Sequence, residues 1–174
     1  HGKIDDVGVE LYEHMLKEVV SQLKGEEVQD SDEMPEVKIS IPFFIPEDYI
    51  SDFEVRIQIY REISSIKSVD EIEVTMQNIA DRFGVIPDQV SNLIEIIRIK
   101  IIAKSLQISK IDIGIKNVLL HFSEKFTKQD DIVKKIQSQS QDVQLKSANS
   151  IFLQCTGKTL IEKAYNAMKW VKNL

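Results

Sequence analysis

The fold depends on residues 81–87, which read Asp81-Arg82-Phe83-Gly84-Val85-Ile86-Pro87. Before them, apolar residues recur at helical spacing and end at Phe83. A glycine directly after the last apolar residue ends a helix, because it adopts positive φ without strain. Pro87, with its fixed φ and no N–H donor, suits the first turn of a second helix. The spacing therefore predicts two helices joined by a rigid corner that carries Asp81 and Arg82.

Helical spacing also occurs in other parts of the chain. Residues 90–106 are apolar around most of the helix circumference, which predicts a central helix contacted on several sides. The other periodic segments are amphipathic and have a single face to bury. They span residues 9–24, 52–65, 69–83, 130–137 and 158–173.

Alternating apolar and polar residues predict strands later in the chain. Residues 111–115 and 118–122 alternate on either side of Lys116-Asn117, which predicts a β-hairpin. A second pair is expected at residues 143–145 and 151–153, and a short strand at residues 37–41. Because helices cluster first and strands follow, we expect an α+β fold. Its architecture would be a cluster of amphipathic helices packed on a small, largely antiparallel sheet.

Composition limits the classes of function. The 174 residues are 43% hydrophobic, which is enough for one core, and carry a formal net charge of −6. This charge repels phosphate, so binding to nucleic acid or an anionic membrane would need a local basic patch. No apolar run reaches the roughly 18 residues of a membrane span. The lone Cys155 fits a reducing compartment, so we expect a cytoplasmic protein in which this thiol is buried and structural.

Short motifs give no sign of catalysis. Thr156-Gly157-Lys158-Thr159 resembles the end of a phosphate-binding loop, but Phe152 stands where that motif has a glycine. We therefore expect Thr156 or Thr159 to cap a helix. The histidines lie far apart, with no cysteine or second histidine at ligand spacing; they are His1, His14 and His121. The prediction is a chain with no catalytic residue, no metal site and no cofactor of its own.

Basic residues leave a second class of function open. An RNA-stacking platform formed by Arg56, Tyr60 and Arg61 is disfavoured, because the interleaved Glu54 and Glu62 predict a salt-bridged surface. The terminal helix is a better candidate for an accessory nucleic-acid module, whose affinity would fall steeply with salt. Its lysines are Lys163, Lys169 and Lys172.

Several motifs in order resemble a known family. Residues 81–87, the stretch Pro46-Glu47-Asp48-Tyr49-Ile50 and the helix that carries Arg56 resemble the C-terminal domain of bacterial transcription-repair coupling factors. Residues 2–8 and Leu11-Tyr12 resemble the tail of the translocase motor of that family. The resemblance implies three segments, which are a translocase tail with a connecting helix at 1–24, an acidic linker at 25–35 and a regulatory domain at 36–174.

The resemblance also implies a function without catalysis in this part of the protein. In that family the motor uses ATP and magnesium to translocate on double-stranded DNA, displaces stalled RNA polymerase and recruits the damage-recognition ATPase of nucleotide excision repair. The C-terminal domain docks on the N-terminal domain of the same protein and masks the surface that binds this ATPase. Engagement with polymerase releases the docked state. No membrane partner is implied.

The resemblance assigns the docking residues to the corner and the end of the helix before it. The family uses two acids three residues apart that face arginines of the N-terminal domain; here the second is Asp81, and Asn78 replaces the first. We expect Asn78, Asp81 and Arg82 to make the interdomain contact, with a weakened or re-paired interface. A second departure is Gln107, where the family commonly has glycine, so we expect a different turn there. The corner scaffold would be Phe83, Gly84 and Pro87.

Overall fold

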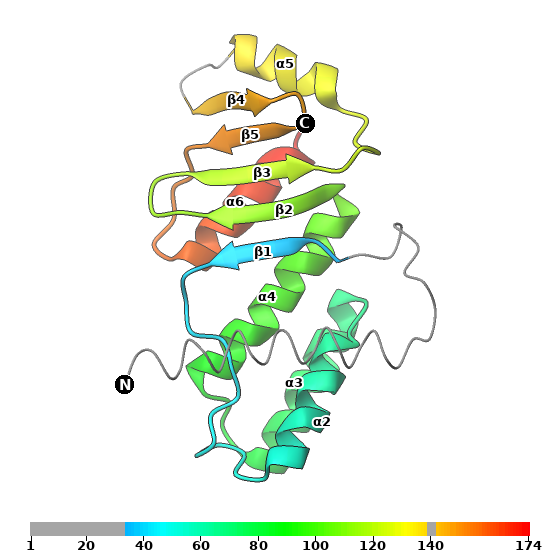
Figure 1. The fold of residues 1–174 in the computed structure, drawn as a ribbon, viewed down its shortest axis with the longest axis vertical. Helices are drawn as coiled ribbons and strands as arrows, with labels where there is room; N and C mark the ends of the chain where they lie inside the picture. Colours follow the sequence, from blue (N-terminus) through cyan, green and yellow to red (C-terminus); the bar gives the residue numbers. More distant parts are fainter. Residues whose placement is uncertain (1–33, 139–141) are drawn as a thin grey trace. The chain divides into compact units, whose positions relative to one another are not determined.

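The computed structural model describes residues 34–138 and 142–174 (Figure 1). The helix expected at residues 9–24, the motifs that resemble a translocase tail and most of the acidic linker at residues 25–35 therefore lie outside the described residues. Among the helices of the described part, none combines the length and the apolar character that crossing a membrane requires.

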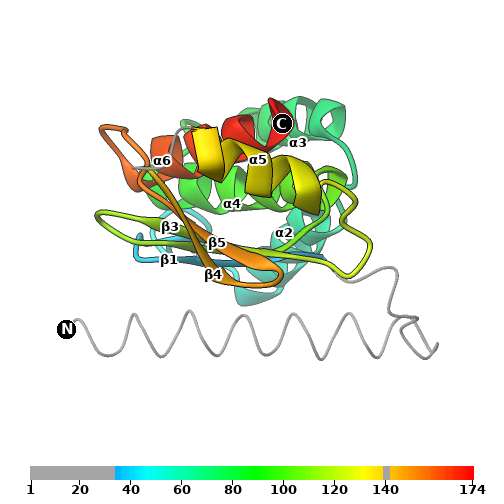
Figure 2. The ribbon, with the colours of Figure 1, turned by 90° about the horizontal axis from the view of Figure 1, so that it is seen from above.

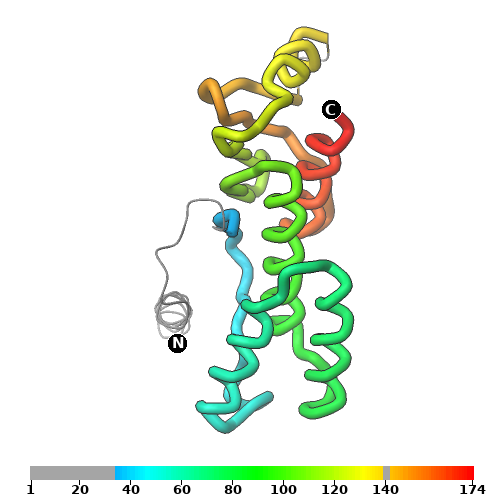
Figure 3. The backbone as a smooth tube through the Cα atoms, turned by 90° about the vertical axis from the view of Figure 1, so that its right-hand side faces the viewer, coloured from blue at the N-terminus to red at the C-terminus, as the bar shows by residue number. Residues whose placement is uncertain are grey.

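The described chain forms two compact units, residues 42–94 and residues 34–41 together with 95–174. In the first unit, α2 (Phe53–Ser64) and α3 (Val69–Phe83) lie side by side (Figure 3). Helix α2 begins where the sequence predicts, because the Asp52 carboxylate accepts from two backbone N–H groups of its first turn, at 2.9 and 3.1 Å. The expected helix at residues 69–83 is confirmed at both ends.

Helix α4 (Asp88–Ser105) begins in the first unit and continues into the second. It starts two residues earlier than the sequence predicts and ends one residue earlier. Branched aliphatic side chains fill the core of the first unit, which explains why its helices hold together without a sheet. The buried members are Ile59, Ile63, Ile72, Ile79, Val90 and Ile94.

The second unit contains a sheet with the strand order β1-β2-β3-β5-β4. Strand β1 runs parallel to β2, and the remaining neighbours are antiparallel. The expected α+β class with a largely antiparallel sheet is therefore confirmed. The strands are β1 (Glu36–Ile39), β2 (Ile108–Ile113), β3 (Val118–Phe122), β4 (Val143–Ser147) and β5 (Ser150–Leu153).

Helices α5 (Gln129–Ser138) and α6 (Leu160–Lys172) lie on the same side of this sheet (Figure 2). Helix α6 contacts β2 and β3 with an apolar face of small and medium side chains. Its buried residues are Ala164, Ala167, Met168 and Val171. Both helices confirm the segments expected at residues 130–137 and 158–173.

Strand β2 lies earlier in the sequence than the alternating pattern predicts, because it begins at Ile108 rather than at residue 111. Strand β2 ends at Ile113, and Ile115, expected to continue it, is 82% exposed in the connecting loop. The loop closes when the N–H of Gly114 donates to the carbonyl of Asn117 at 2.9 Å. The alternation of apolar and polar residues therefore continues in the sequence beyond Ile113, where the backbone leaves the sheet.

Gln107, between α4 and β2, has a positive φ of 61°. Its N–H donates to the carbonyl of Lys104 at 3.1 Å, and its carbonyl accepts from the N–H of Ser123 at 2.9 Å. Positive φ is costly for a residue with a Cβ. The sequence predicted a different turn here, but a turn of the kind that glycine favours is kept, with glutamine in the strained conformation.

Replacing Gln107 with glycine should therefore stabilise the chain. Relief of positive φ contributes about 1–2 kcal/mol, and the extra freedom of glycine in the unfolded chain removes about 0.5–1 kcal/mol. We expect Gln107→Gly to raise the free energy of unfolding by up to about 1.5 kcal/mol in urea titrations. The matched control is Gln144→Gly in strand β4, which should lower it. A lower unfolding midpoint for Gln107→Gly would contradict the strain assigned to this turn.

Candidate functional site

The corner at residues 81–87 has a backbone conformation that glycine alone adopts easily. Gly84 has φ 91° and ψ −162°, a region that is essentially restricted to glycine. Its N–H donates to the carbonyl of Ala80 at 2.9 Å and closes the last turn of α3. The prediction that glycine ends this helix is confirmed, although ψ is extended rather than left-handed helical.

Pro87 precedes α4 rather than lying in its first turn as expected. Its carbonyl oxygen accepts from the N–H groups of Val90 at 3.1 Å and Ser91 at 3.0 Å. Asp88 is therefore the first helical residue, where its charge lies near the positive end of the helix dipole. The backbone of the corner is fixed at both ends.

Tyr49 ties the corner to a loop far away in sequence. Its hydroxyl donates to the carbonyl of Gly84 at 2.9 Å. Its ring meets Phe83 edge to face, with centroids 6.1 Å apart and planes at 63°, a favoured geometry for aromatic pairs. These contacts link the stretch at residues 46–50 to the corner.

Arg56 holds this loop from within the core. The sequence placed Arg56 on an exposed, salt-bridged face with Glu54 and Glu62, and this was wrong: its side chain is 4% exposed. Its Nη1 donates to the carbonyls of Ile50 at 2.7 Å and Ser51 at 3.1 Å. The available signal was its spacing, because it lies one turn before the buried Tyr60 on the same helix face.

Three further contacts fix the rest of the loop. The carboxylate of Glu47 lies 3.6 Å from Nη2 of Arg56. The hydroxyl of Tyr60 accepts from the N–H of Ile45 at 2.6 Å, and the side chain of Ile45 is buried in the core. Asn92 donates to the carbonyl of Pro42 at 2.9 Å. The loop before α2 is therefore held at several points along its length.

The predicted docking residues Asn78, Asp81 and Arg82 are all exposed on the last turns of α3. One carboxylate oxygen of Asp81 accepts from Nε2 of Gln77 at 2.8 Å, which orients the acid along the helix. The guanidinium of Arg82 lies 4.8 Å from the centroid of the Phe83 ring, a cation–π distance. The structure thus brings an oriented acid and a stacked base together beside the rigid corner.

Two exposed valines at this surface were missed by sequence reasoning. Val74 is 62% exposed, and Val85 is 93% exposed. Val74 lies four and seven residues before Asn78 and Asp81, so helix geometry places the three on one face. The signal was available, because Val74 falls on the polar side of the predicted stripe. Val85 was read only as part of the corner.

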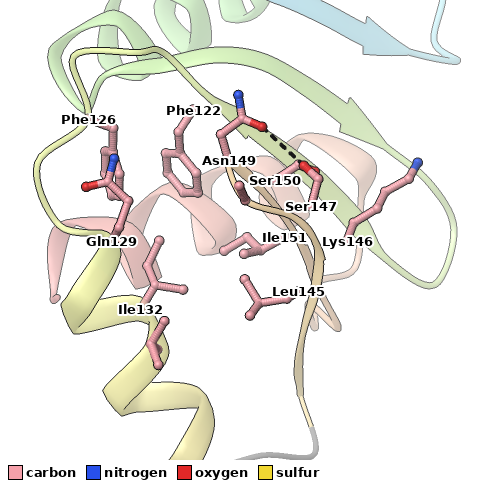
Figure 4. Close-up of a pocket in the computed structure, with 12 residues that line it drawn as sticks. Phe122, Phe126, Gln129, Ile132, Leu145, Lys146, Ser147, Asn149, Ser150 and Ile151 are labelled. Atoms are coloured by element: carbon pink, nitrogen blue, oxygen red, sulfur yellow. Dashed lines mark hydrogen bonds between the residues drawn. The ribbon is translucent and has the colours of Figure 1, made fainter.

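The sheet unit contains an apolar cavity of about 270 Å³ between α5 and the β4–β5 hairpin (Figure 4). Phe122, Phe126 and Ile132 line it, whereas Lys146 points away from it. This cavity suits apolar side chains rather than polar reaction chemistry. Across residues 34–138 and 142–174, no group of three or more His, Cys, Asp or Glu side chains is placed to hold a metal ion.

A side-chain hydrogen bond caps the start of the terminal helix, α6. The side-chain oxygen of Thr159 accepts from the N–H of Glu162 at 3.1 Å, which confirms the capping role expected of Thr156 or Thr159. Of the three lysines in the alternative nucleic-acid surface, Lys163 donates to the carbonyl of Ile115. Lys169 and Lys172 are exposed. The basic surface of this helix is therefore partly used by an internal contact.

Cys155 lines a smaller cavity of about 240 Å³ together with Asp142 and Trp170. The sequence predicted a buried thiol, and the side chain is half-buried. Burial, followed by the negative charge of Asp142, raises the pKa of this thiol from 9.0 to about 11. A thiol held neutral is a poor nucleophile, which agrees with the structural role predicted for it.

Comparison with known proteins identifies the family. The model of the TRCF domain family matches residues 39–135, more than half of the chain. The chain belongs to the TRCF domain family. The transcription-repair-coupling factor of Rickettsia typhi is 31% identical over 172 residues, which cover 97% of this chain, and that of Escherichia coli is 33% identical over 128 residues, 71% of this chain. The aligned regions span 15% and 11% of those relatives.

A solved structure has the same fold as this TRCF domain. It is the C-terminal domain of a transcription-repair coupling factor, with a TM-score of 0.63 and 20% identity over 80% of this chain and 94% of that chain. The resemblance noted in the sequence is thereby confirmed for family and fold. The family match includes the loop with Tyr49, all of α3 and the corner.

The backbone of Gly84 predicts the effect of adding a Cβ. No heavy atom lies within 4 Å of the place that such a Cβ would take, so the cost of Gly84→Ala is conformational alone. We expect a loss of about 1–3 kcal/mol in the free energy of unfolding. The control is Val85→Ala at the next residue, which is exposed and should change it by less than about 0.5 kcal/mol. Equal midpoints for both variants in urea titrations would rule out strain at the corner.

The raised pKa of Cys155 predicts slow alkylation. At pH 8 the folded chain should react with iodoacetamide about a hundredfold more slowly than the urea-unfolded chain, because its pKa is higher by about two units. The rate should then climb with pH up to about 11. Asp142→Asn removes a neighbouring negative charge, so it should lower the pKa and raise the rate at pH 8. A folded rate that levels off near pH 9 would contradict this assignment.

Proposed function

We propose that this chain is a regulatory, non-catalytic part of a DNA translocase that acts in transcription-coupled repair. In this proposal it docks on the N-terminal domain of the same protein and masks the surface that binds the damage-recognition ATPase of nucleotide excision repair. Contact with stalled RNA polymerase releases it. ATP, magnesium and double-stranded DNA are handled by the motor, outside this chain.

The observation that carries the proposal is the oriented pair Asp81 and Arg82 beside a rigid corner. Both side chains are exposed, and the backbone that follows them is fixed by the bonds of Gly84 to Ala80 and Tyr49. A surface that is already ordered loses less conformational entropy on binding. Charged groups in a fixed geometry also select a partner of complementary charge.

The proposed docked state needs only a modest free-energy advantage over the open state. A docked state favoured by about 2.8 kcal/mol keeps the open form near one molecule in a hundred, since each 1.4 kcal/mol is a factor of ten. Engagement of a partner that favours the open form then shifts the population. Asn78 can donate and accept hydrogen bonds but brings no charge, so Asp81 supplies the acidic contact at this surface in the proposal.

The alternative, an accessory nucleic-acid module, uses the lysines of α6. Lys163 already donates to a carbonyl within the domain, and the formal net charge of −6 opposes binding to phosphate. These two observations favour the docking proposal over the alternative.

Reversing the charge of Asp81 tests the proposal. We expect Asp81→Arg to weaken binding of the 174-residue chain to the N-terminal domain by at least about tenfold, or about 1.4 kcal/mol, because a basic partner group would then face a like charge. Isothermal titration calorimetry gives the dissociation constants.

A matched control separates the site from the overall charge. Glu124→Arg makes the same change in net charge at an exposed position between β3 and α5, and it should bind like the wild type. Equal affinities for Asp81→Arg and the wild type would place the contact elsewhere. Thermal melts of both variants check that the fold is intact.

A further inference from the structure

Val74 and Val85 stand on either side of the docking residues in the sequence. Single exposed apolar residues are common on protein surfaces and by themselves indicate nothing. These two differ in position, because Val74 shares a helix face with Asn78 and Asp81, and Val85 follows Asp81 by four residues on the fixed corner. In sequence order, this part of the chain therefore has an exposed apolar residue, then polar and charged residues, and then a second exposed apolar residue.

Val85 is held ready for contact. Its side chain is 93% exposed, yet the carbonyl of the preceding Gly84 is bound by Tyr49. Valine has one side-chain torsion, which is strongly restricted by its branched Cβ. Burying it in an interface therefore costs little conformational entropy compared with a long flexible side chain.

The charge of α3 indicates what kind of partner surface fits. The helix carries Asp70, Glu71, Glu73 and Asp81 against a single base, Arg82. A complementary surface is therefore basic, and it must also present apolar groups opposite the valines if these are to be covered.

We infer that Val74 and Val85 form an apolar part of the docking surface, which contacts an apolar patch next to basic groups on the N-terminal domain. This inference rests on the proposed function and names the second component of its interface. Apolar contact would maintain the docked state where Asn78 has removed a charge, because burial of apolar surface does not depend on ion pairing.

Serine substitutions in the 174-residue chain test the inference. We expect Val85→Ser to weaken binding to the N-terminal domain about tenfold, and Val74→Ser about fivefold, measured by isothermal titration calorimetry. Both factors should be the same or larger at about 1 M salt as at about 0.1 M salt, whereas the effect of Asp81→Asn should shrink because salt screens charges. Ile115→Ser, at a similarly exposed isoleucine in the other unit, is the control and should bind like the wild type.

The outcomes distinguish a failure of the apolar contact from a failure of the proposed docking function. If the wild-type chain does not bind, or if Asp81→Arg binds like the wild type, the docking function itself is wrong and the inference fails with it. If Asp81→Arg weakens binding while both serine variants keep wild-type affinity, the docking function stands and the apolar contact alone is overturned. Unchanged melting temperatures for the serine variants establish that any loss arises at the interface.

Discussion

The buried guanidinium of Arg56 is the contact on which the candidate surface depends. It binds the carbonyls of Ile50 and Ser51, and the adjacent Tyr49 binds the carbonyl of Gly84. Taking an arginine out of water is expensive unless its donors are satisfied. Backbone carbonyls of a loop accept from Nη1 and the Glu47 carboxylate lies 3.6 Å from Nη2, whereas Nε is buried without a hydrogen-bond partner. The loop and the arginine therefore hold each other in place through Nη1 and Nη2. The buried Arg56 thereby supports the loop whose Tyr49 hydroxyl binds the corner.

This arrangement explains how a helix end can serve as a specific contact surface. Helix ends often fray, because their last carbonyls lack partners within the helix. In this domain the end of α3 is closed by Gly84 and supported by the Tyr49–Phe83 contact. The side chains of Asp81 and Arg82 are further restrained by Gln77 and the Phe83 ring. The proposed surface is therefore polar and exposed, but it is ordered before any partner arrives.

Local features were predictable from the sequence, and long-range ones were not. Periodicity, together with Gly84 and with Thr156 or Thr159 as expected caps, located the helices to within about two residues at each end, because caps and faces are properties of neighbouring residues. The bond from Tyr49 to Gly84 joins residues that are distant in sequence, and no spacing rule predicts it. The burial of Arg56 did have a local signal, its spacing from Tyr60 on α2, which the prediction did not use. The parallel placement of β1 was likewise not predicted. Ile115 shows a different error, because the alternating pattern placed it in a strand that ends at Ile113.

The parallel pairing of β1 with β2 has a consequence for the order of folding. The two strands are separated in sequence by the entire helical unit of residues 42–94, which is inserted within the chain of the sheet unit. During synthesis β1 leaves the ribosome long before its partner exists. Closing so long a loop is entropically costly, and prior folding of the inserted helices shortens the flexible chain between the strands. The hairpins β2–β3 and β4–β5 are each joined by a short loop, and the connection that contains α5 between them is much shorter than residues 42–94. We therefore expect β1 to be the last strand to join the sheet.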